Sequence, residues 1–597
     1  MTKDGRMRCA RESKIRYIMY LELRFWGKSM IVGIDLGTTN SLVSVWTDEG
    51  VKLIPNEFGE YLTPSVVSFG KETYVGKTAK EMLITKPENT FKEFKRLMGK
   101  DVKLKREDGG SVSPIELSAI IIRKLVNDAE KYLNEEVTEA VISVPAYFDD
   151  HQREATRLAG VKAGIKVTQL VNEPSAAALA YHIRNIDEDE RFIVFDFGGG
   201  TLDVTLVEAF DNMVEICNIS GDNSLGGKDF NEAIAIDICN KTGHDWNALN
   251  LKEQAVFIAF AENIKIALSS SDEVSAKVNI EDKEYEYSLT QQELIDLSEP
   301  IFKRITVVLK KLMNDSMLNI EDISGVIMVG GSSKMPCVRA YVSSLFGGKV
   351  HMDPEGDVSI CKGAGVVTGI NLRKEEVKDI VMTDICSFSL GIEILGGVMS
   401  VIIPKNQTLP VSRMHRYYTV HDNQSKIEIN IYQGENHIAS RNLLLDNFSV
   451  RVPRLPKGEA FVDVRFSYDL NGIFDIDVHC PLNGASVHRS RGANMGVDSD
   501  YMDKLKLNME ELKQDPRELP EVKYVIERAL RIFEEGNEYQ KRAIEIELMR
   551  FDNVLETCRI PECQKAAAGF ALRLKELEKT MFRFEGETDD LWDDILK

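Results

Sequence analysis

The sequence has few of the features that mark secreted, membrane-spanning or nucleic-acid-binding proteins. Its nine cysteines are scattered and never spaced C-x-x-C, which disfavours a disulfide framework or a zinc site and predicts a cytoplasmic location. No run of 18 or more apolar residues is present, so we expect no membrane partner. The 95 acidic side chains outnumber the 74 basic ones, and the resulting net charge of −21 repels phosphodiesters. We therefore expect no nucleic-acid partner.

The chain is long enough for several domains, since its 597 residues correspond to about four units of ordinary size. Residues 1–29 are expected to be a disordered or upstream-start extension, because charges interrupt their apolar stretch and no cleavage site follows. From residue 30 to about 373, short apolar strands alternate with helical patterns, as in α/β architectures. Residues 391–480 alternate with a period of two and predict a β domain. After about residue 498, Leu/Glu/Lys-rich stretches poor in glycine predict a helical subdomain.

One internal repeat suggests chemistry. Residues 31–39 and 192–201 each contain a strand, an aspartate, a glycine-rich turn and a threonine. Alternating residues follow both turns, so we predict two β-hairpins, whose glycine amides and threonine hydroxyls could clamp a triphosphate from two sides. Asp35 and Asp196 end the two strands and could hold a hydrated Mg²⁺. A single such hairpin is equally well a plain glycine turn, and the duplication favours the phosphate site.

Two further segments could complete a nucleotide site. Residues 330–332 follow an apolar strand, where a flat backbone could accommodate an adenine or ribose, or simply begin a helix with a serine cap. A helix predicted over residues 253–270 carries three polar side chains on one face, which could equally form a solvated ion pair. These three residues are Glu262, Lys265 and Ser269.

Hydrolysis of a phosphoanhydride needs charge neutralisation and a positioned water more than a covalent catalyst. Lys95 and Glu173 are candidates for this work, although spacing alone does not distinguish Lys95 from its neighbours. No Walker loop, and no Rossmann glycine motif in the right context, is present.

Five motifs occur in an order typical of one family: residues 33–41, 144–148, 172–178, 196–201 and 329–332. On these motifs the chain resembles the seventy-kilodalton heat-shock chaperone family, the DnaK type. It is most similar to the bacterial HscC branch, as residues 381–386 and the short tail suggest. The resemblance covers residues 30 to about 480, and the helical tail matches only in type.

The resemblance implies a multidomain α/β + β + α architecture. An actin-like, two-lobed ATPase domain is expected over residues 30–378, a linker over 379–384, a β-sandwich peptide-binding domain over 385–484 and a helical lid over 498–597. The implied cofactors are ATP, Mg²⁺ and K⁺. The implied function is that of an ATP-dependent chaperone of the stress response, with slow ATPase activity, which binds exposed apolar peptide segments and releases them on nucleotide exchange.

The resemblance also assigns roles residue by residue. Catalytic roles fall to Lys95, Glu173, Thr201 and Asp203, and metal binding to Asp35 and Asp196. ATP is expected to contact Gly37, Thr38, Thr39, Asn40, Gly198, Gly199, Gly200, Thr201, Glu262, Lys265, Ser269, Gly330, Gly331, Ser332 and Asp357. The allosteric switch is assigned to Pro145, Arg153 and Asp384. The peptide pocket is assigned to Ile392, Ile427 and Ile429 with Leu395 and Val420 arching over it, although without the resemblance these residues would be assigned to the sandwich core.

The implied partners are unfolded polypeptides, a J-domain co-chaperone and a nucleotide exchange factor. Gln169 stands where the family usually has an arginine that contacts the J-domain, so this contact is in doubt. The apolar linker residues Ile380, Val381 and Met382 are expected to dock in one nucleotide state and to be exposed in the other. A dedicated regulator that holds one partner remains an alternative. A small-molecule kinase on the same fold is a further one, against which the region after Asp379 argues.

Overall fold

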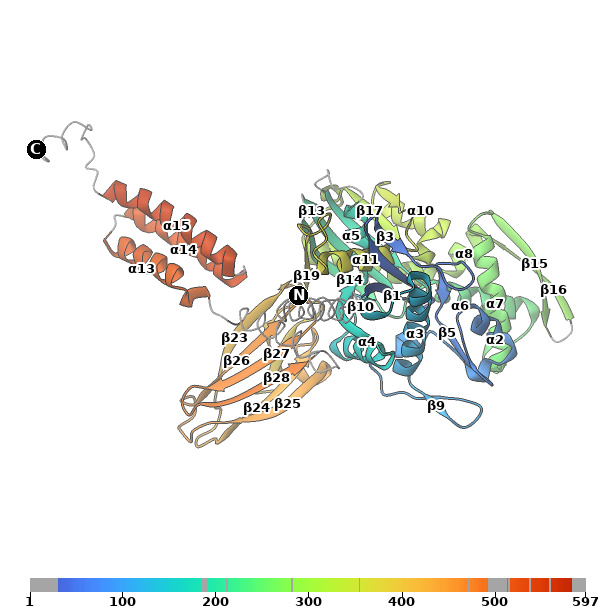
Figure 1. Cartoon of the computed structure of the whole chain (residues 1–597), viewed down its shortest axis with the longest axis horizontal. Helices are drawn as coiled ribbons and strands as arrows, with labels where there is room; N and C mark the ends of the chain where they lie inside the picture. The colour runs from blue at the N-terminus through green and yellow to red at the C-terminus, as the bar shows by residue number, and fades with distance from the viewer. Residues whose placement is uncertain are drawn as a thin grey trace, which may run out of the picture.

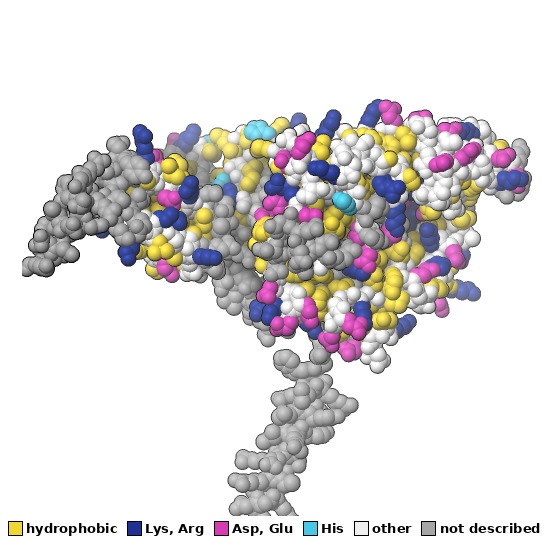
Figure 2. Space-filling view, turned by 90° about the horizontal axis from the view of Figure 1, so that it is seen from above, with side chains coloured by type: hydrophobic (Ala, Val, Ile, Leu, Met, Phe, Trp, Pro, Cys, Tyr) yellow, Lys and Arg dark blue, Asp and Glu magenta, His cyan; other side chains and the backbone are white. Residues whose placement is uncertain are grey.

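The computed structural model describes residues 30–183, 190–210, 213–280, 283–353, 355–470, 472–491, 513, 516–535, 538–557 and 560–581. The predicted extension over residues 1–29 and both ends of the predicted lid, residues 498–512 and 582–597, lie outside this part. Figure 1 shows a large α/β part, a β-sandwich beside it and a helical bundle beyond the sandwich. In the view of Figure 2, acidic and basic side chains are intermixed over the visible face. None of the described helices is long and apolar enough to cross a membrane.

The first lobe of the α/β part is built on a six-stranded sheet in the order β11-β10-β1-β2-β3, with β4 also paired to β2. Helices α3 and α4 pack on one face, and α5 and α11 on the other. A Cβ on Gly33 would lie 2.5 Å from the backbone nitrogen of Gly365, so glycine here lets α11 approach β1 closely. The elements are β1 (Met30–Leu36), β2 (Asn40–Thr47), β3 (Gly50–Leu53), β4 (Thr63–Pro64), β10 (Val137–Val144), β11 (Lys166–Asn172), α3 (Pro114–Leu133), α4 (Asp150–Lys162), α5 (Glu173–His182) and α11 (Ser359–Asn371).

A smaller unit extends the first lobe. It contains a three-stranded sheet in the order β6-β5-β7, a two-stranded ribbon and a helix, and its apolar side chains join the same core. A 3₁₀ helix over Phe94–Leu97 follows β7 and carries Lys95. The elements are β5 (Val66–Phe69), β6 (Thr73–Val75), β7 (Thr90–Lys92), β8 (Leu104–Lys105), β9 (Ser111–Val112) and α2 (Lys77–Thr85).

The second lobe is built on a seven-stranded sheet in the order β18-β17-β12-β13-β14-β19-β22. The large buried side chains of its core come from β12, β13 and the helices beside them. The helix predicted over residues 253–270 is α7, which ends three residues earlier, at Ala267. The elements are β12 (Glu190–Phe197), β13 (Leu202–Phe210), β14 (Met213–Asp222), β15 (Glu273–Ile280), β16 (Lys283–Thr290), β17 (Gly325–Val329), β18 (Val350–Met352), α6 (Gly227–Thr242), α7 (Leu251–Ala267), α8 (Gln291–Leu297), α9 (Glu299–Ser316) and α10 (Pro336–Leu345).

The predicted linker forms a strand of the second lobe's sheet. β19 (Val381–Ile385) pairs in parallel with β14, and its far end pairs with β22 (Thr408–Leu409) of the sandwich. Ile380, just before β19, is 7% exposed and packs in the buried cluster beside β14, whereas Val381, the first residue of β19, is 44% exposed. The linker is therefore docked in this structure, but Val381 does not take part in the apolar contact that we predicted for it.

The sandwich consists of two four-stranded sheets, in the orders β21-β20-β24-β25 and β23-β26-β27-β28. The inward-facing side chains of both sheets form one core. The predicted hairpin is present as the antiparallel pair β26–β27; Gly472 in its turn has a φ of 75°, and Asn471 lies outside the described residues. The strands are β20 (Leu390–Ile394), β21 (Val398–Ile403), β23 (Val411–Tyr418), β24 (Lys426–Gln433), β25 (Leu443–Arg451), β26 (Phe461–Tyr468), β27 (Phe474–Cys480) and β28 (Ala485–Arg491).

The helical bundle contains α13 (Pro520–Glu535), α14 (Glu538–Thr557) and α15 (Ile560–Met581), which share a small apolar core of their own.

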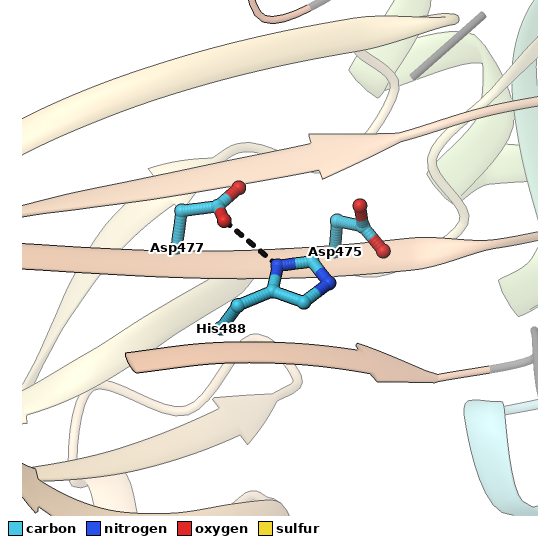
Figure 3. A group of neighbouring side chains, drawn as sticks. All are labelled: Asp475, Asp477 and His488. Carbon is cyan, nitrogen blue, oxygen red and sulfur yellow. Dashed lines mark hydrogen bonds and ion pairs between the residues drawn. The ribbon is translucent and has the colours of Figure 1, made fainter. Parts of the chain in front are cut away.

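A cluster of polar side chains lies on the last two strands of the sandwich, which precede the bundle in the chain. Asp475 and Asp477 of β27 and His488 of β28 lie side by side, and His488 Nδ1 is 2.8 Å from Asp477 Oδ1 (Figure 3). Lys513 Nζ lies 2.9 Å from an oxygen of each carboxylate, so one ammonium group already pairs with both acids.

Candidate functional site

Both repeats form the predicted β-hairpins. β1 pairs antiparallel with β2, and β12 pairs antiparallel with β13, so each glycine-rich turn joins two adjacent strands. The two turns face each other closely, since a Cβ on Gly199 would lie 2.0 Å from the Thr39 hydroxyl oxygen. The hairpin prediction is confirmed, and the facing turns leave backbone amides of both lobes near one point.

A cavity of about 610 Å³ opens between the lobes at these turns. Most residues assigned to the nucleotide or metal line it, although they come from segments more than 300 positions apart. These are Asp35, Gly37, Thr38, Thr39, Asn40, Lys95, Glu173, Asp196, Gly198, Gly199, Thr201, Glu262, Lys265, Ser269, Gly330, Gly331, Ser332 and Asp357. Gly200 and Asp203 do not line the cavity: Gly200 packs against Arg96, and Asp203 is buried on β13, the second strand of the second hairpin.

Three buried carboxylates lie together at the glycine-turn end of the cavity: Asp35 and Asp196 line it, and Asp203 is directly opposite Asp196 in the β12–β13 pair. Asp35, Asp196 and Asp203 are 7%, 6% and 1% exposed, and Ser143 donates a hydrogen bond of 2.8 Å to Asp35 Oδ1. Burial, and then repulsion from the Glu173 carboxylate, raises the pKa of Asp35 to about 6 and that of Asp203 to about 8. The same two causes raise the pKa of Asp196 well above its ordinary value.

Burial is the largest cause of all three shifts, and the nearby Lys95 ammonium lowers these pKa values without offsetting it. The oxygens of Asp203 accept no hydrogen bond of normal geometry from the described part of the chain. A divalent cation would stabilise all three carboxylates in their ionised form. Hard oxygen ligands in small number, with room for water, suit Mg²⁺, so the residues present fit this ion.

Lys95 and Glu173 form a buried ion pair beside the carboxylates. Lys95 Nζ lies 2.5 Å from Glu173 Oε1, and the two side chains are 6% and 7% exposed. Lys95 belongs to the 3₁₀ helix after β7, and Glu173 is the first residue of α5. The structure separates Lys95 from its neighbour Arg96, whose guanidinium points to the carbonyl of Gly200. Lys95 is thus a buried ammonium in the cavity wall, able to neutralise charge on a phosphoryl group.

The other end of the cavity is formed by α7 and the turn after β17. Lys265 Nζ donates a hydrogen bond of 2.9 Å to the Gly227 carbonyl, and burial lowers the pKa of Lys265 to about 8. Ser332 Oγ donates to the Gly198 carbonyl at 2.8 Å, which ties this end to the second hairpin. Asp357 forms an ion pair with Lys334, a cavity residue that our sequence analysis missed.

The three switch residues lie on a path that leads away from the cavity. Arg153 Nη2 donates to Asn172 Oδ1 at 2.6 Å, and Asn172 Nδ2 donates to Asp384 Oδ2 at 2.8 Å. Ser175 Oγ donates to the same Asp384 oxygen at 3.1 Å. The Pro145 carbonyl accepts a hydrogen bond from the amide of Phe148 at the turn before α4. Asn172 and Ser175 were missed as functional residues, although both lie inside a quoted motif.

Asn172 directly precedes Glu173, so two neighbouring residues connect the cavity to the linker. Glu173 contacts Lys95 on the cavity side, and Asn172 contacts Asp384 on the linker side. Burial raises the pKa of Asp384, while hydrogen bonds from the Ile385 amide, Asn172 and Ser175 oppose this rise. A change in the position of Glu173 would therefore reach the linker over a very short distance.

The residues assigned to the peptide site differ in exposure. Ile392, Ile427 and Ile429 are buried in the core between the two sheets of the sandwich. Leu395 is 69% exposed at the loop after β20, and Val420 is partly buried. Burial of the isoleucines agrees with a core role and equally with a closed pocket, so their assignment to a peptide site stays a prediction.

Lys405 and Asn406 of the sandwich contact the α/β part. Lys405 Nζ lies 3.0 Å from the Tyr147 hydroxyl, and Asn406 Nδ2 donates to Asn218 Oδ1 at 2.9 Å. Asp150 is held from two sides, by Gln433 at its backbone amide and by Arg491 at its carboxylate. These polar contacts, together with the docked linker, join the peptide-binding candidate to the lobes.

Comparison with known proteins gives consistent results. A sequence model of the family described as Hsp70 protein matches residues 31–532. The Chaperone protein DnaK of Thermotoga petrophila is 37% identical over 466 residues, which cover 75% of this chain and 78% of that protein. The Chaperone protein DnaK of Thermosipho africanus is 38% identical over 466 residues, which cover 75% of this chain and 77% of the relative.

Proposed function

The chain belongs to the Hsp70 family and is an ATP-dependent chaperone with ATPase activity, and we propose that the cavity between its lobes is the ATP site that controls client binding in the sandwich. One observation carries this proposal. The pair Lys95–Glu173 lines the cavity, and Asn172, the residue before Glu173, holds Asp384 of the linker. A phosphate at Lys95 would thus act on the linker through two adjacent residues.

In the proposed reaction, the facing hairpin turns bind the phosphates through their backbone amides and the hydroxyls of Thr38, Thr39 and Thr201. Asp35, Asp196 and Asp203 would hold Mg²⁺, which would supply positive charge where negative charge develops during phosphoryl transfer. Lys95 neutralises charge on the transferred group. We propose that Glu173 holds the Lys95 ammonium in position for this role.

The proposed coupling begins when the γ-phosphate attracts Lys95. The Lys95 ammonium is then shared between the phosphate and Glu173, so the ion pair with Glu173 becomes weaker. Glu173, at the start of α5, can then shift together with Asn172. Arg153 and Asp384 both bind Asn172, so the shift changes the hydrogen bond that holds Asp384 of β19 to the first lobe. We propose that this changes the balance between a docked and a released linker.

We further propose that the sandwich binds extended apolar segments of client proteins, with main-chain hydrogen bonds along the peptide and one side chain in a pocket formed by Ile392, Ile427 and Ile429. Leu395 and Val420 would close over the peptide. The proposed domain limits are residues 30–378, 379–384, 385–484 and 498–597. Cytoplasmic location, a role in stress, K⁺ as a second ion, and a J-domain protein and an exchange factor as partners complete the proposal.

Membership in the HscC branch is also a proposal. It is supported by the sequence of residues 381–386 and by the short helical tail. Gln169, which stands where the family usually presents an arginine to J-domains, fits a branch with its own co-chaperone. Its side chain accepts a hydrogen bond of 3.1 Å from Asn371 Nδ2.

Single-turnover ATP hydrolysis tests the catalytic assignment. Lys95→Ala and Thr201→Ala are expected to lose hydrolysis while still binding ATP, because the amides of the two turns remain. Lys100→Ala is the matched control, since Lys100 is exposed and lies outside the cavity. Hydrolysis at the natural rate in both Lys95→Ala and Thr201→Ala would refute the proposed site.

A further inference from the structure

One short segment of the first lobe contacts the second lobe twice. Glu93 Oε2 lies 3.3 Å from Lys228 Nζ, and the Arg96 guanidinium donates a hydrogen bond to the Gly200 carbonyl. Lys228 is in the first turn of α6, and Gly200 is in the turn between β12 and β13. The segment that carries Lys95 therefore reaches across the cleft on both sides of Lys95.

The local backbone explains this arrangement. Glu93 precedes the 3₁₀ helix over Phe94–Leu97, in which residues three apart lie on the same side. Glu93 and Arg96 are three apart and both turn to the second lobe, whereas Lys95 turns to Glu173. Glu93 has a φ of 57°, which is uncommon for a residue with a side chain. This left-handed residue sets the direction in which its carboxylate leaves the chain.

The two contacts hold one connected unit of the second lobe. The amide of Gly227 donates to the Gly198 carbonyl at 3.0 Å, and the amide of Lys228 donates to the Gly199 carbonyl at 3.0 Å. The start of α6 and the glycine turn must therefore move together. Arg96 also fits closely, because a Cβ on Gly200 would lie 2.6 Å from Arg96 Nε.

We propose that Glu93–Lys228 and Arg96–Gly200 form a cross-lobe clasp that must open before nucleotide leaves the cavity, and that Glu93 and Lys228 thereby set the rate of nucleotide release. This proposal rests on the proposed function, since the cavity must be the nucleotide site. Glu93 and Lys228 both line the cavity, at its edge with the phosphate turns. Closing the clasp also places Lys95, so these residues act as positioning residues rather than catalytic ones.

The Glu93–Lys228 pair is suited to a device that opens repeatedly. Its side chains are 31% and 35% exposed, so solvent screens the pair and its rupture is easy. Lys77 Nζ lies 2.7 Å from Glu60 Oε1 within the first lobe, and neither residue lines the cavity. Lys77→Gln therefore removes a partly exposed ion pair that does not bridge the cleft, which makes it a matched control.

The rate at which a fluorescent ADP dissociates from the full chain, after mixing with excess unlabelled ADP, tests the clasp. Glu93→Gln and Lys228→Gln are each expected to speed release about two- to fivefold at low salt, as for a half-exposed ion pair. The double charge reversal Glu93→Lys with Lys228→Glu is expected to restore the natural rate to within about twofold. Lys77→Gln is expected to leave the rate unchanged. High salt is expected to speed release from the natural chain but not from Glu93→Gln.

The outcome separates the clasp from the proposed function. If the natural chain binds ADP and both single variants release it at the natural rate, the clasp is wrong and the nucleotide site stands. If the double reversal releases ADP as fast as the two single effects multiplied together, the pair does not interact and the clasp is equally wrong. A natural chain that binds no ADP would overturn the nucleotide site and the clasp with it.

Discussion

Replacing Ile380 by aspartate should separate ATP binding from client release. Ile380 lies just before β19, is 7% exposed and packs in the buried cluster that contains Val214 and Ile385. Its side chain can be buried only when the linker is docked beside β14. The cavity contains no linker residue, so the substitution leaves the nucleotide site itself unchanged.

The size of the effect follows from two contributions. Loss of the buried isoleucine side chain removes about 1.5–3 kcal/mol from the docked state. A polar group placed in the same apolar surroundings without a partner costs a further 1–3 kcal/mol or so. The sum, about 2.5–6 kcal/mol, reaches at its upper end the roughly 5.5 kcal/mol that moves a two-state equilibrium from one side to the other. Ile380→Asp should therefore leave the linker mostly released even when ATP is bound.

Hydrogen exchange of the amides of residues 381–385 measures docking, and dissociation of a labelled apolar peptide on addition of ATP measures coupling. We expect Ile380→Asp to lose both the protection and the ATP-induced release, with ATP binding retained. Val381→Asp is the control one residue away, since Val381 is 44% exposed in the docked linker. Release from Ile380→Asp as fast as from the natural chain, or equal loss in both variants, would refute the reasoning.

Three further predictions concern other parts of the molecule. Gln169→Arg should increase stimulation of the ATPase by a generic J-domain protein, because a charge-assisted hydrogen bond is worth about 1.5–3 kcal/mol; strong stimulation of the natural chain would contradict this. Burial lowers the pKa of Lys265 to about 8, so its ammonium is lost as the pH rises, and nucleotide affinity should fall between about pH 7 and 9 in the natural chain but not in Lys265→Arg. A flat pH profile in both would exclude Lys265 from the site. Lys513→Met leaves Asp475 and Asp477 without their ammonium, and losing one partner of a buried ion pair costs about 3–5 kcal/mol. We expect this ion pair to hold the helical bundle in place, so bound peptide should dissociate faster from the variant in the presence of ADP. An unchanged rate would show that Lys513 does not hold the bundle.

The sequence predicted those features of the fold that have a local pattern. Alternation after each glycine turn indicated hairpins, and the duplication of the turn indicated that two of them act together. Spacing could not select Lys95, because its burial depends on Glu173, 78 positions away. Likewise, nothing local to Arg96 indicates that Gly200 lies within hydrogen-bond distance across the cleft.

The linker and the sandwich show two other limits. The three apolar linker residues look alike in the sequence, and only the tertiary packing around the start of β19 buries Ile380 and leaves Val381 exposed. In the sandwich, Ile427 and Ile429 have the period-two pattern of any inward-facing strand residues. A peptide pocket and a core share this pattern, so periodicity cannot distinguish them.

The central claim is that the nucleotide in the cavity controls how fast a bound client dissociates from the sandwich. The most direct test is the dissociation rate of one labelled apolar peptide from the natural full chain, measured with Mg²⁺ and either ATP or ADP at saturating concentrations. The account predicts that ATP speeds dissociation relative to ADP. Identical rates with ATP and ADP, with both nucleotides shown to be bound, would contradict it.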